Sequence, residues 1–375
     1  MTEGGHRRPG AAAPVSGIAK GLAWRGFGLT LRVLRLGYAA FGKVRDVDVL
    51  VYKVDRLGDW LLAEPAIARI VEATRSRGGT VAVWAGKESA ALRAWRPPDF
   101  RVEEFALDPR GPSAKLRRAC AAVRLLAAYR ARTLICLRHT PEPVRDFVLA
   151  RADAGAVHAL SRCFAPGPGS GLPHEIERHH AILLGAGMAP ADARQLLPRC
   201  ARRDTARSSR VVLAPFSSAP IKDWRDEGWL EVIAGLAGRG LQFDIWVGPD
   251  QLGRAASLAR RAAARAAGER VNVKSGALAE LAEAVGSAHL VLSVDTFAAH
   301  LGVVLDAPMV CLIGGGQYGD FGPWQNSARQ RWVAHPLPCY GCNWRCRLAR
   351  VECLEDITPE SVLGEVASVL MSGSG

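Results

Sequence analysis

Short apolar runs rich in β-branched residues alternate with longer segments rich in alanine, leucine and arginine from residue 46 onward. This alternation predicts parallel strands covered by helices, an α/β fold. The predicted strands span residues 47–54, 80–84, 133–137, 210–214, 242–247, 290–294 and 309–313. Between residues 197 and 210 the chain is polar and arginine-rich, after which the alternation starts again. We therefore predict two parallel-sheet domains of similar size, with a cleft between the carboxyl ends of their strands.

These changes in pattern divide the chain into five segments. Residues 1–17 are rich in glycine, alanine and proline and show no periodicity, which predicts a mobile tail. Residues 18–45 predict a basic amphipathic helix, and residues 46–200 and 205–335 predict the two domains. Residues 336–375 hold a cysteine-rich loop and a last helix, which we expect to pack back on the first domain.

The helix predicted at residues 18–45 has an apolar, aromatic-rich stripe. Its members recur at three- and four-residue steps: Trp24, Phe27, Leu31, Leu34, Tyr38 and Phe41. The basic residues beside or opposite the stripe are Lys20, Arg25, Arg32, Arg35 and Lys43. Such a helix lies either in the interface of an anionic membrane or against the surface of its own protein, and amphipathicity alone does not distinguish the two.

The composition of the 375-residue chain narrows the class of protein. Hydrophobic residues make up 49% and charged residues 23%, and no run of 18 apolar residues occurs, so a disordered chain and a membrane-spanning helix are excluded. Lysine and arginine outnumber aspartate and glutamate by 49 to 36, and the net charge of +13 favours an anionic partner. The chain has no aromatic-basic recognition motif, so we do not expect nucleic acid to be that partner.

The cysteine content bears on the compartment. Nine cysteines, an odd number in a chain without a recognisable signal peptide, indicate a reducing compartment. Arg7 and Arg8 precede a Pro/Gly/Ala stretch and not an apolar segment, which argues against an export signal. We expect a cytoplasmic protein that is peripheral on the inner face of the plasma membrane.

A first candidate site lies at residues 55–59, Asp-Arg-Leu-Gly-Asp, where the first strand of the domain runs into a helix. A glycine directly before Asp59 places this carboxylate at the mouth of the predicted cleft, where it could act as a general base. Alternatively, Asp59 caps the following helix by accepting a backbone N–H bond, which is the commoner role of aspartate at such a position.

A second candidate site follows the first strand of the second domain. Residues 215–224 contain Ser217, Ser218 and Lys222, whose hydroxyl groups and ammonium suit a diphosphate. The alternative is an ordinary loop with a solvated lysine.

A third candidate site is the junction of the strand at 290–294 with the helix that starts at Asp295 or Thr296. The free N–H groups at such a helix start bind anions, and the Thr296 hydroxyl adds a donor. Neither a Gly-rich dinucleotide fingerprint nor a Walker loop occurs at any strand-helix junction.

A fourth candidate is a cluster of four cysteines, Cys339, Cys342, Cys346 and Cys353. Four thiolates at this spacing could bind a structural zinc ion tetrahedrally, or they could be reduced thiols in a loop.

In their order along the chain, these motifs resemble glycosyltransferase family 9, the bacterial heptosyltransferases, over residues 46–368. The motifs that carry the resemblance are the loop at 55–59 with Pro65 after it, His174-Glu175 with Arg178, Lys222-Asp223-Trp224 with Trp229, Asp295-Thr296 with His300-Leu301, the segment 321–324, and the cysteine cluster followed by 357–360. The resemblance implies the GT-B architecture, with two Rossmann-like domains that face a cleft. The first domain would bind an acceptor and the second a nucleotide-diphosphate sugar.

The resemblance also implies an inverting reaction that needs no catalytic metal or other cofactor. Asp59 would be the general base, and the diphosphate would bind to Lys222, Ser217, Ser218 and the amides of Thr296, Phe297 and Ala298. Asp295 and Asp250 would contact the donor sugar and nucleoside, and Arg56, Arg138 and His139 would contact the acceptor. The implied donor is ADP-heptose, and the implied acceptor is a lipid-linked or cell-envelope glycan such as lipopolysaccharide core.

Two departures from the family pattern leave a second function open. Phe297 stands where the family has a glycine after Asp-Thr, and residues 314–316 read Gly-Gly-Gly where the family commonly has Gly-Pro-Thr. The alternative function is a catalytically idle scaffold of the same fold that binds glycan or nucleotide at the membrane.

Overall fold

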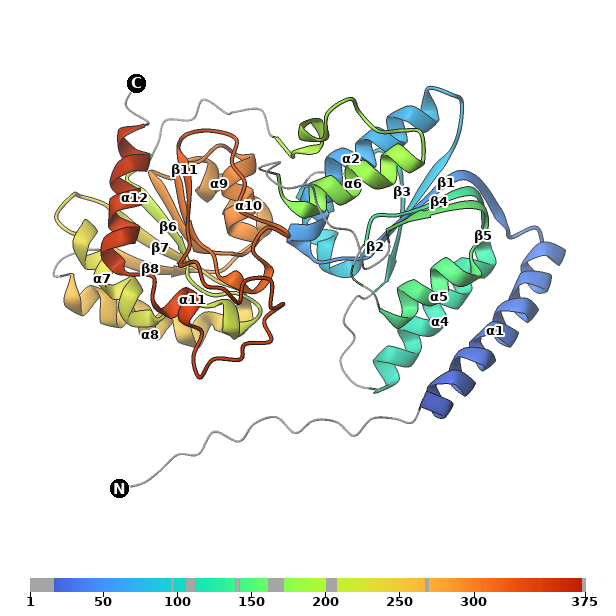
Figure 1. Ribbon diagram of the computed structural model, residues 1–375, viewed down its shortest axis with the longest axis horizontal. Helices are drawn as coiled ribbons and strands as arrows, with labels where there is room; N and C mark the ends of the chain where they lie inside the picture. The colour runs from blue at the N-terminus through green and yellow to red at the C-terminus, as the bar shows by residue number, and fades with distance from the viewer. Residues whose placement is uncertain are drawn as a thin grey trace.

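The computed structural model describes residues 17–95, 98–105, 112–138, 140, 142–160, 172–199, 208–266 and 270–372. Residues 1–16 of the predicted tail lie outside the described residues. Two parallel sheets lie side by side, each with helices on both faces, and the cysteine-rich loop and the last helix lie against the second sheet (Figure 1). The predicted α/β fold with two parallel-sheet domains is confirmed.

The first domain has a five-stranded sheet in the order β3-β2-β1-β4-β5. Its strands are β1 (Arg45–Lys53), β2 (Val81–Gly86), β3 (Arg101–Phe105), β4 (Tyr129–Cys136) and β5 (Asp153–Ala159). Its helices are α1 (Gly17–Ala40), α2 (Leu57–Arg75), α3 (Ala90–Trp95), α4 (Pro112–Ala128), α5 (Pro143–Arg151) and α6 (His174–Gly185). Short 3-10 turns follow β2 at Lys87–Ser89 and α6 at Ala193–Leu196.

The second domain has a six-stranded sheet in the order β11-β10-β9-β6-β7-β8. Its strands are β6 (Arg210–Ala214), β7 (Gln242–Trp246), β8 (Arg270–Lys274), β9 (Leu290–Val294), β10 (Met309–Leu312) and β11 (Gln330–Val333). Its helices are α7 (Asp226–Leu236), α8 (Leu252–Arg265), α9 (Leu278–Gly286), α10 (Phe297–Val304), α11 (Glu352–Glu355) and α12 (Pro359–Met371). Further 3-10 turns span Pro220–Lys222, Pro249–Gln251 and Gly315–Gln317.

The extent to which a strand is buried explains whether its sequence pattern predicted it. The central strands β6, β9 and β10 are buried on both faces and read as apolar runs, as in β9 where every residue is buried. All four strands that the apolar pattern missed lie at or near a sheet edge, namely β3, β5, β8 and β11. Most residues of β5 and β8 are exposed or half-buried, so no apolar run marks them.

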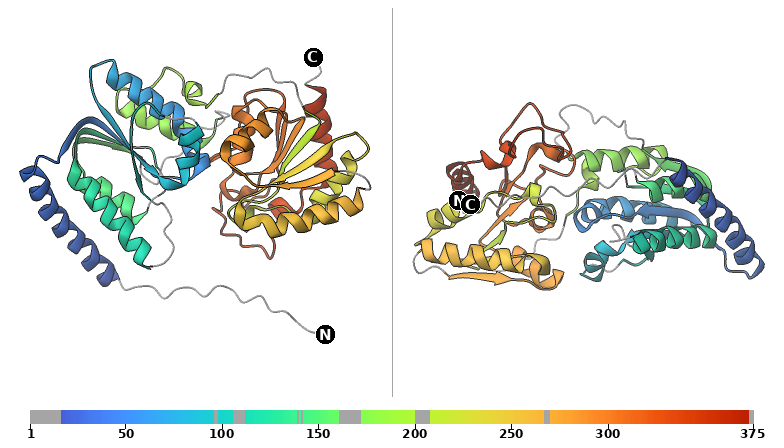
Figure 2. Two further views of the ribbon diagram at one scale, coloured as in Figure 1. Left: turned by 180° about the vertical axis from the view of Figure 1, so that it is seen from behind. Right: turned by 90° about the horizontal axis from the view of Figure 1, so that it is seen from below.

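Helix α1 packs along α4 at the edge of the first domain that lies farthest from the second (Figure 2). Its predicted apolar stripe faces inward, because Phe27, Leu31, Leu34 and Tyr38 pack into the core between the sheet, α4 and α5. The ring centroids of Phe27 and Phe147 lie 6.5 Å apart. At these four residues the stripe therefore packs against the protein's own surface, which is the second of the two predicted alternatives, whereas Phe41 of the stripe is 78% exposed.

A different face of α1 points away from the domain. Leu29, Val33 and Leu36 follow each other at helical spacing and are 66%, 62% and 74% exposed. The side chains of residues 18–25, Trp24 among them, lie outside the described residues. In the part of the chain that the structure describes, no helix is long and apolar enough to cross a membrane.

The last helix does not return to the first domain. Helix α12 packs on α7, β10 and β11 of the second domain, so the predicted packing on the first domain is wrong. Val362, Val366 and Val369 lie on one face of α12 and are buried in the second core. Thr358 caps the helix by accepting a hydrogen bond from the amide of Ser361, and Pro359 occupies the first helical turn.

Candidate active site

A cleft of about 650 Å³ opens between the two domains at the carboxyl ends of their central strands. The residues that line it are Asp55, Arg56, Leu57, Gly58, Asp59, Glu88, Arg138 and Thr140 from the first domain, and Phe216, Ser217, Ser218, Ala219, Lys222, Asp295, Thr296, Phe297, His300, Gln317, Phe321 and Trp344 from the second. Most of the predicted site residues thus meet in one cavity, as expected where open parallel sheets bind ligands.

Asp59 lies in the first turn of α2 and faces this cleft. The N-cap of α2 is Arg56, which has an extended backbone and makes no capping bond with its side chain. Asp59 is therefore not the N-cap residue that the alternative interpretation required. The neighbouring Gly58 approaches the second domain so closely that a Cβ there would lie 3.4 Å from the imidazole of His300.

Lys222 and Asp295 form an ion pair on the opposite wall of the cleft. Lys222 Nζ lies 3.2 Å from Asp295 Oδ2. Lys222 ends a 3-10 turn after β6, while Asp295 directly follows β9 and is buried. The two motifs are adjacent because β6 and β9 are neighbours in the sheet.

The start of α10 faces the cleft beside this pair. Thr296 is the N-cap of α10 and lines the cleft, and its Oγ1 lies 3.2 Å from Ser293 Oγ. The N–H groups of the first turn and the helix dipole favour an anion at this end. Phe297 also lines the cleft and packs against the core, whereas the side chain of Ala298 is buried inside α10.

The two predicted serines have different surroundings. Ser217 is buried, its hydroxyl donates to the carbonyl of Ala219 at 2.6 Å, and its amide donates to Asp223 Oδ1 at 2.6 Å, so it shapes the loop. Ser218 Oγ accepts a hydrogen bond from Arg56 Nη1 at 3.1 Å, which joins the two domains across the cleft.

The predicted acceptor and nucleoside residues are only partly brought together. Arg138 lines the cleft but is buried, and its guanidinium donates to Asp55 Oδ1 at 2.7 Å and to the carbonyl of Val54. His139 lies outside the described residues. Asp250 is exposed in the turn after β7 and is not among the residues that line the cleft.

A buried lysine behind the 55–59 loop was not predicted. Lys53, at the end of β1, is fully buried, with Nζ 2.9 Å from Asp55 Oδ2 and 2.7 Å from Glu175 Oε1. Burial alone would lower the pKa of Lys53, but the carboxylates of Asp55 and Glu175 raise it above its ordinary value. The signal available in the sequence was a lysine inside an otherwise apolar strand.

His300 is a second residue whose role the sequence did not show. Its Nδ1 accepts a hydrogen bond from Trp324 Nε1 at 3.0 Å, and its Nε2 lies 3.8 Å from Asp295 Oδ1. Burial lowers the pKa of His300, and the nearby Asp295 offsets this only in part. A neutral ring with its proton on Nε2 fits both contacts.

The four clustered cysteines surround one small pocket together with Gly315, Gly316 and Trp344. All four are free thiols, and burial raises the pKa of the Cys353 thiol. Among the described residues, no three or more His, Cys, Asp or Glu side chains are arranged to hold a metal ion. The arrangement of the described side chains gives no support to the zinc site.

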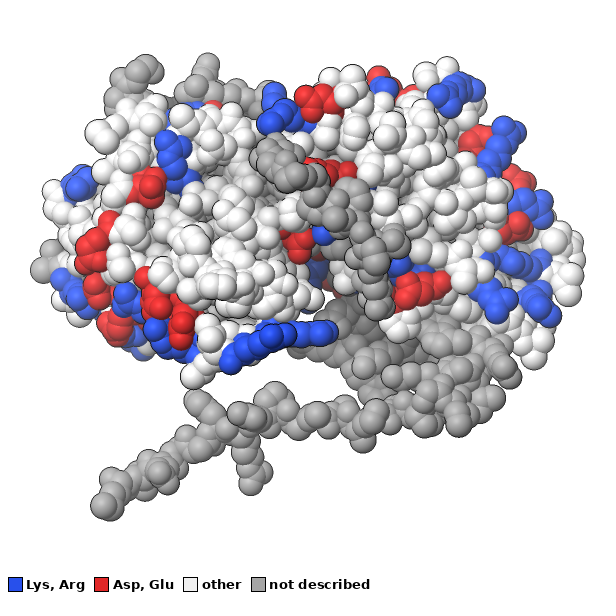
Figure 3. Space-filling view, viewed as in Figure 1, with Lys and Arg blue, Asp and Glu red and all other residues white. Residues whose placement is uncertain are grey.

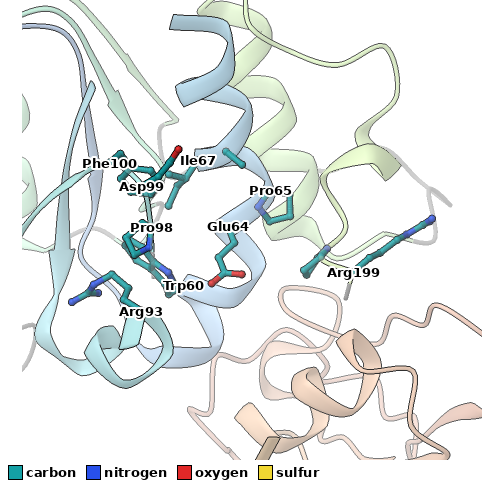
Figure 4. Close-up of a pocket in the computed structure, with 11 residues that line it drawn as sticks. Trp60, Glu64, Pro65, Ile67, Arg93, Pro98, Asp99, Phe100 and Arg199 are labelled. Carbon is teal, nitrogen blue, oxygen red and sulfur yellow. The ribbon is translucent and has the colours of Figure 1, made fainter. Parts of the chain in front are cut away.

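A separate pocket of about 340 Å³ lies beside α2, outside the cleft. Figure 4 shows Trp60, Ile67 and Phe100 among the residues that line it, with Glu64 projecting from α2. The guanidinium of Arg93 lies 5.1 Å from the ring centroid of Trp60. This pocket contains none of the predicted site residues.

Part of the chain matches the sequence model of a known protein family. The model of glycosyltransferase family 9 (heptosyltransferase) matches residues 186–347, which include Lys222, Asp295 and Thr296. The predicted resemblance to this family is confirmed. The match and the fold together support a glycosyltransferase, and no curated protein sequence matches the chain.

Solved structures show the same two-domain fold. A family 9 glycosyltransferase from Veillonella parvula has a TM-score of 0.62 and 16% identity, with 88% of this chain and 99% of that chain covered. The E. coli heptosyltransferase WaaC, solved with ADP-2-deoxy-2-fluoro heptose, has a TM-score of 0.57 and 20% identity over 85% and 99% of the two chains. The iron-containing heptosyltransferase TibC from enterotoxigenic E. coli, solved with ADP-D-β-D-heptose, has a TM-score of 0.54 and 16% identity over 88% and 78%.

Proposed function

We propose that this glycosyltransferase transfers a heptose from a nucleotide-diphosphate donor to a lipid-linked or cell-envelope glycan such as lipopolysaccharide core. The transfer inverts the configuration at the anomeric carbon of the heptose. One observation carries the proposal. The cleft places Asp59 of the first domain across from Lys222, Asp295 and the start of α10 in the second. A base on one wall and an anion-binding wall opposite are what sugar transfer from a diphosphate leaving group requires.

In the proposed reaction, Asp59 takes the proton from an acceptor hydroxyl while that oxygen attacks the anomeric carbon of the donor sugar. The bond between the anomeric carbon and the diphosphate breaks, and the nucleoside diphosphate leaves from the opposite face of the sugar. Lys222 and the amides at the start of α10 stabilise the negative charge that grows on the leaving group. Asp295 lies beside Lys222, where it can accept hydrogen bonds from the sugar hydroxyls. No step in this scheme requires a metal ion.

The donor is tested by thermal shift of the purified protein with ADP, UDP, GDP and CDP, because a ligand that binds the folded state stabilises it. Two structural relatives were solved with ADP-linked heptoses, which supports ADP as the expected ligand here. A shift by UDP or GDP alone would remove the heptose donor but keep the reaction class. No shift with any of the four would favour the idle scaffold.

The base is tested by Asp59→Asn, with Glu88→Gln as the matched control because Glu88 is another carboxylate that lines the cleft. We expect Asp59→Asn to lower turnover by about 10²- to 10⁴-fold, the usual contribution of a general base, while nucleotide affinity stays unchanged. Glu88→Gln should retain most of the turnover. If the two variants exchange these outcomes, Glu88 is the base.

Metal independence is part of the same proposal. Turnover of the protein after dialysis against EDTA should equal that of the untreated protein. Loss of turnover that zinc or magnesium restores would contradict it.

The acceptor side of the proposal includes an anionic membrane surface bound through α1. Along the edge of the first domain on the right of Figure 3, lysine and arginine side chains outnumber the aspartate and glutamate side chains among them. Arg32, Arg35 and Arg130 line one groove there together with Leu36. This arrangement suits anionic lipid headgroups beside the exposed apolar face of the helix.

A further inference from the structure

Trp344 lies between the interdomain cleft and a small pocket of the second domain. Its side chain lines the cleft and also lines the small pocket that the four clustered cysteines surround. The residue belongs to the cysteine-rich loop, more than a hundred residues after Lys222 in sequence, and no sequence motif pointed to it. The cysteine-rich loop thus contributes one wall of the candidate active site.

The indole of Trp344 packs directly on the glycine-rich turn after β10. A Cβ at Gly314 would lie 2.7 Å from a ring carbon of Trp344, and a Cβ at Gly316 would collide with the same ring. The indole Nε1 donates to Gln317 Oε1 at 3.2 Å. The Gly-Gly-Gly sequence therefore has a physical reason, because any side chain at 314 or 316 would displace the indole.

The backbone of the loop is adapted to place the ring. Trp344 has a φ of 60° and Asn343 a φ of 49°, both in the left-handed region that residues with a Cβ rarely adopt. Two such residues in succession aim the indole back at the glycine turn. These two backbone conformations cost free energy, at the place where the side chain of Trp344 reaches the cleft.

The indole face holds the ammonium group of Lys222. Lys222 Nζ lies 5.3 Å from the ring centroid of Trp344 and 3.2 Å from Asp295 Oδ2. An aromatic face attracts a cation without accepting its N–H groups as a carboxylate does, so those donors remain available for phosphate oxygens. A lysine chain has four flexible carbons, and a fixed ring limits where its charge can lie.

We propose that Trp344 is a positioning residue that holds Lys222 at the site of the donor diphosphate. This inference rests on the proposed function, because it assigns the role of Trp344 within the same donor site. It makes the cysteine-rich loop a part of donor recognition, and it predicts that loss of the indole weakens diphosphate binding specifically.

The test measures Kd by isothermal titration on the full chain, for the nucleoside diphosphate that gives the largest thermal shift and for the matching monophosphate. Trp344→Leu should weaken diphosphate binding by about 3- to 30-fold, the range of a cation–π contact, and leave monophosphate binding nearly unchanged. Trp344→Phe keeps an aromatic face and should restore most of the diphosphate affinity. In a Lys222→Met background, Trp344→Leu should have no further effect on the diphosphate.

Tyr340→Leu is the matched control. Tyr340 belongs to the same loop and packs on Gly315 as Trp344 packs on Gly316, but it does not line the cleft. We expect this variant to bind the diphosphate like the parent protein. If Tyr340→Leu weakens binding as much as Trp344→Leu, the effect is loop packing and the inference fails.

Two further outcomes separate the inference from the function on which it rests. If the parent protein binds a nucleoside diphosphate and Trp344→Leu binds it equally well, the inference is wrong and the proposed function stands. If the parent protein binds none of the four nucleoside diphosphates, the proposed function fails and the inference fails with it.

Discussion

Lys53 Nζ lies 2.7 Å from Glu175 Oε1, and both side chains are almost completely shielded from solvent. The pair joins the end of β1 to the first turn of α6. The same turn contacts the second domain, because the amide of His174 donates to the carbonyl of Gly319 at 2.7 Å. Arg178 of the same helix forms an ion pair with Asp320 at 2.8 Å. The buried pair therefore connects the strand that leads to Asp59 to the contact between the domains.

Replacement of Lys53 by methionine should destabilise the fold strongly. The substitution keeps the length of the apolar chain but removes the cation nearest to Glu175, leaving only Arg178 at 3.7 Å, and it leaves Asp55 with Arg138 alone. Removal of one partner of a buried pair costs about 3–5 kcal/mol. Urea denaturation of the parent and of Lys53→Met measures this difference in the free energy of unfolding.

The control is an exposed pair of the same chemistry. Arg75 Nη1 lies 2.7 Å from Asp99 Oδ2, with 46% and 78% of the two side chains exposed. Arg75→Met should change the free energy of unfolding by about 1 kcal/mol or less. An equally small change in Lys53→Met would show that water or a shift in protonation satisfies the buried carboxylates.

The sequence predicted the fold well where burial is complete and poorly where it is partial. The runs at 210–214 and 290–294 became β6 and β9 with the expected bounds, because both faces of these strands are covered. The strands β5 and β8 lie at sheet edges, and their polar residues look like loop. Helix α12 was found in sequence but placed on the wrong domain, because three valines on one face do not say which sheet they cover.

The sequence predicted some residues of the candidate active site and missed others. Asp59, Lys222 and Thr296 were identified from their positions at strand ends, and the structure places all three in one cleft. Lys53 and Trp344 were missed for a physical reason. Lys53 acts through partners 122 residues away at Glu175, and Trp344 reaches the cleft from a loop whose path depends on the glycine turn. The lysine inside an apolar strand marks Lys53 but not its distant partner Glu175, and no local pattern marks Trp344.

A second prediction concerns the pH dependence of stability through His300. Burial lowers the pKa of His300 in the folded protein, so below about pH 6.5 the unfolded chain takes up a proton that the folded chain does not. Folding then loses stability as the pH falls. His300→Gln removes this titration, so the stability of the parent relative to His300→Gln should decrease as the pH falls from 8 toward 5.5. Urea denaturation across this range at constant ionic strength measures it.

The titratable groups that do not contact His300 are common to both proteins and cancel in the difference between the two curves, whereas Asp295, 3.8 Å from His300 Nε2, contributes to it. At pH 8 the parent should be the more stable, because His300 Nδ1 accepts the hydrogen bond from Trp324. Curves that run parallel over the whole range would mean that His300 titrates alike in the folded and unfolded chains.

A third prediction compares two glycines whose substitution by alanine should act in opposite directions. At Gly316 a Cβ would collide with the indole of Trp344, so Gly316→Ala should cost about 1–3 kcal/mol in the free energy of unfolding. Gly364 lies inside α12, and nothing is within 4 Å of its would-be Cβ. Gly364→Ala should therefore stabilise the protein by about 0.4–1 kcal/mol. An unchanged or higher stability of Gly316→Ala would show that the glycine turn yields to the added methyl group.

The last prediction concerns the outward face of α1. Leu29, Val33 and Leu36 are exposed and contribute nothing to the core, so their joint replacement by serine should leave the stability of the domain within about 1 kcal/mol of the parent. The same change should lower co-sedimentation with phosphatidylglycerol vesicles on the order of tenfold, because three apolar side chains no longer enter the lipid interface. Leu184→Ser is the control, since Leu184 is 66% exposed on α6, away from α1.

Binding of the parent should also weaken in high salt and with neutral phosphatidylcholine, because arginines flank this face. Equal co-sedimentation of the parent, the triple variant and Leu184→Ser would exclude this face of α1 as the membrane contact.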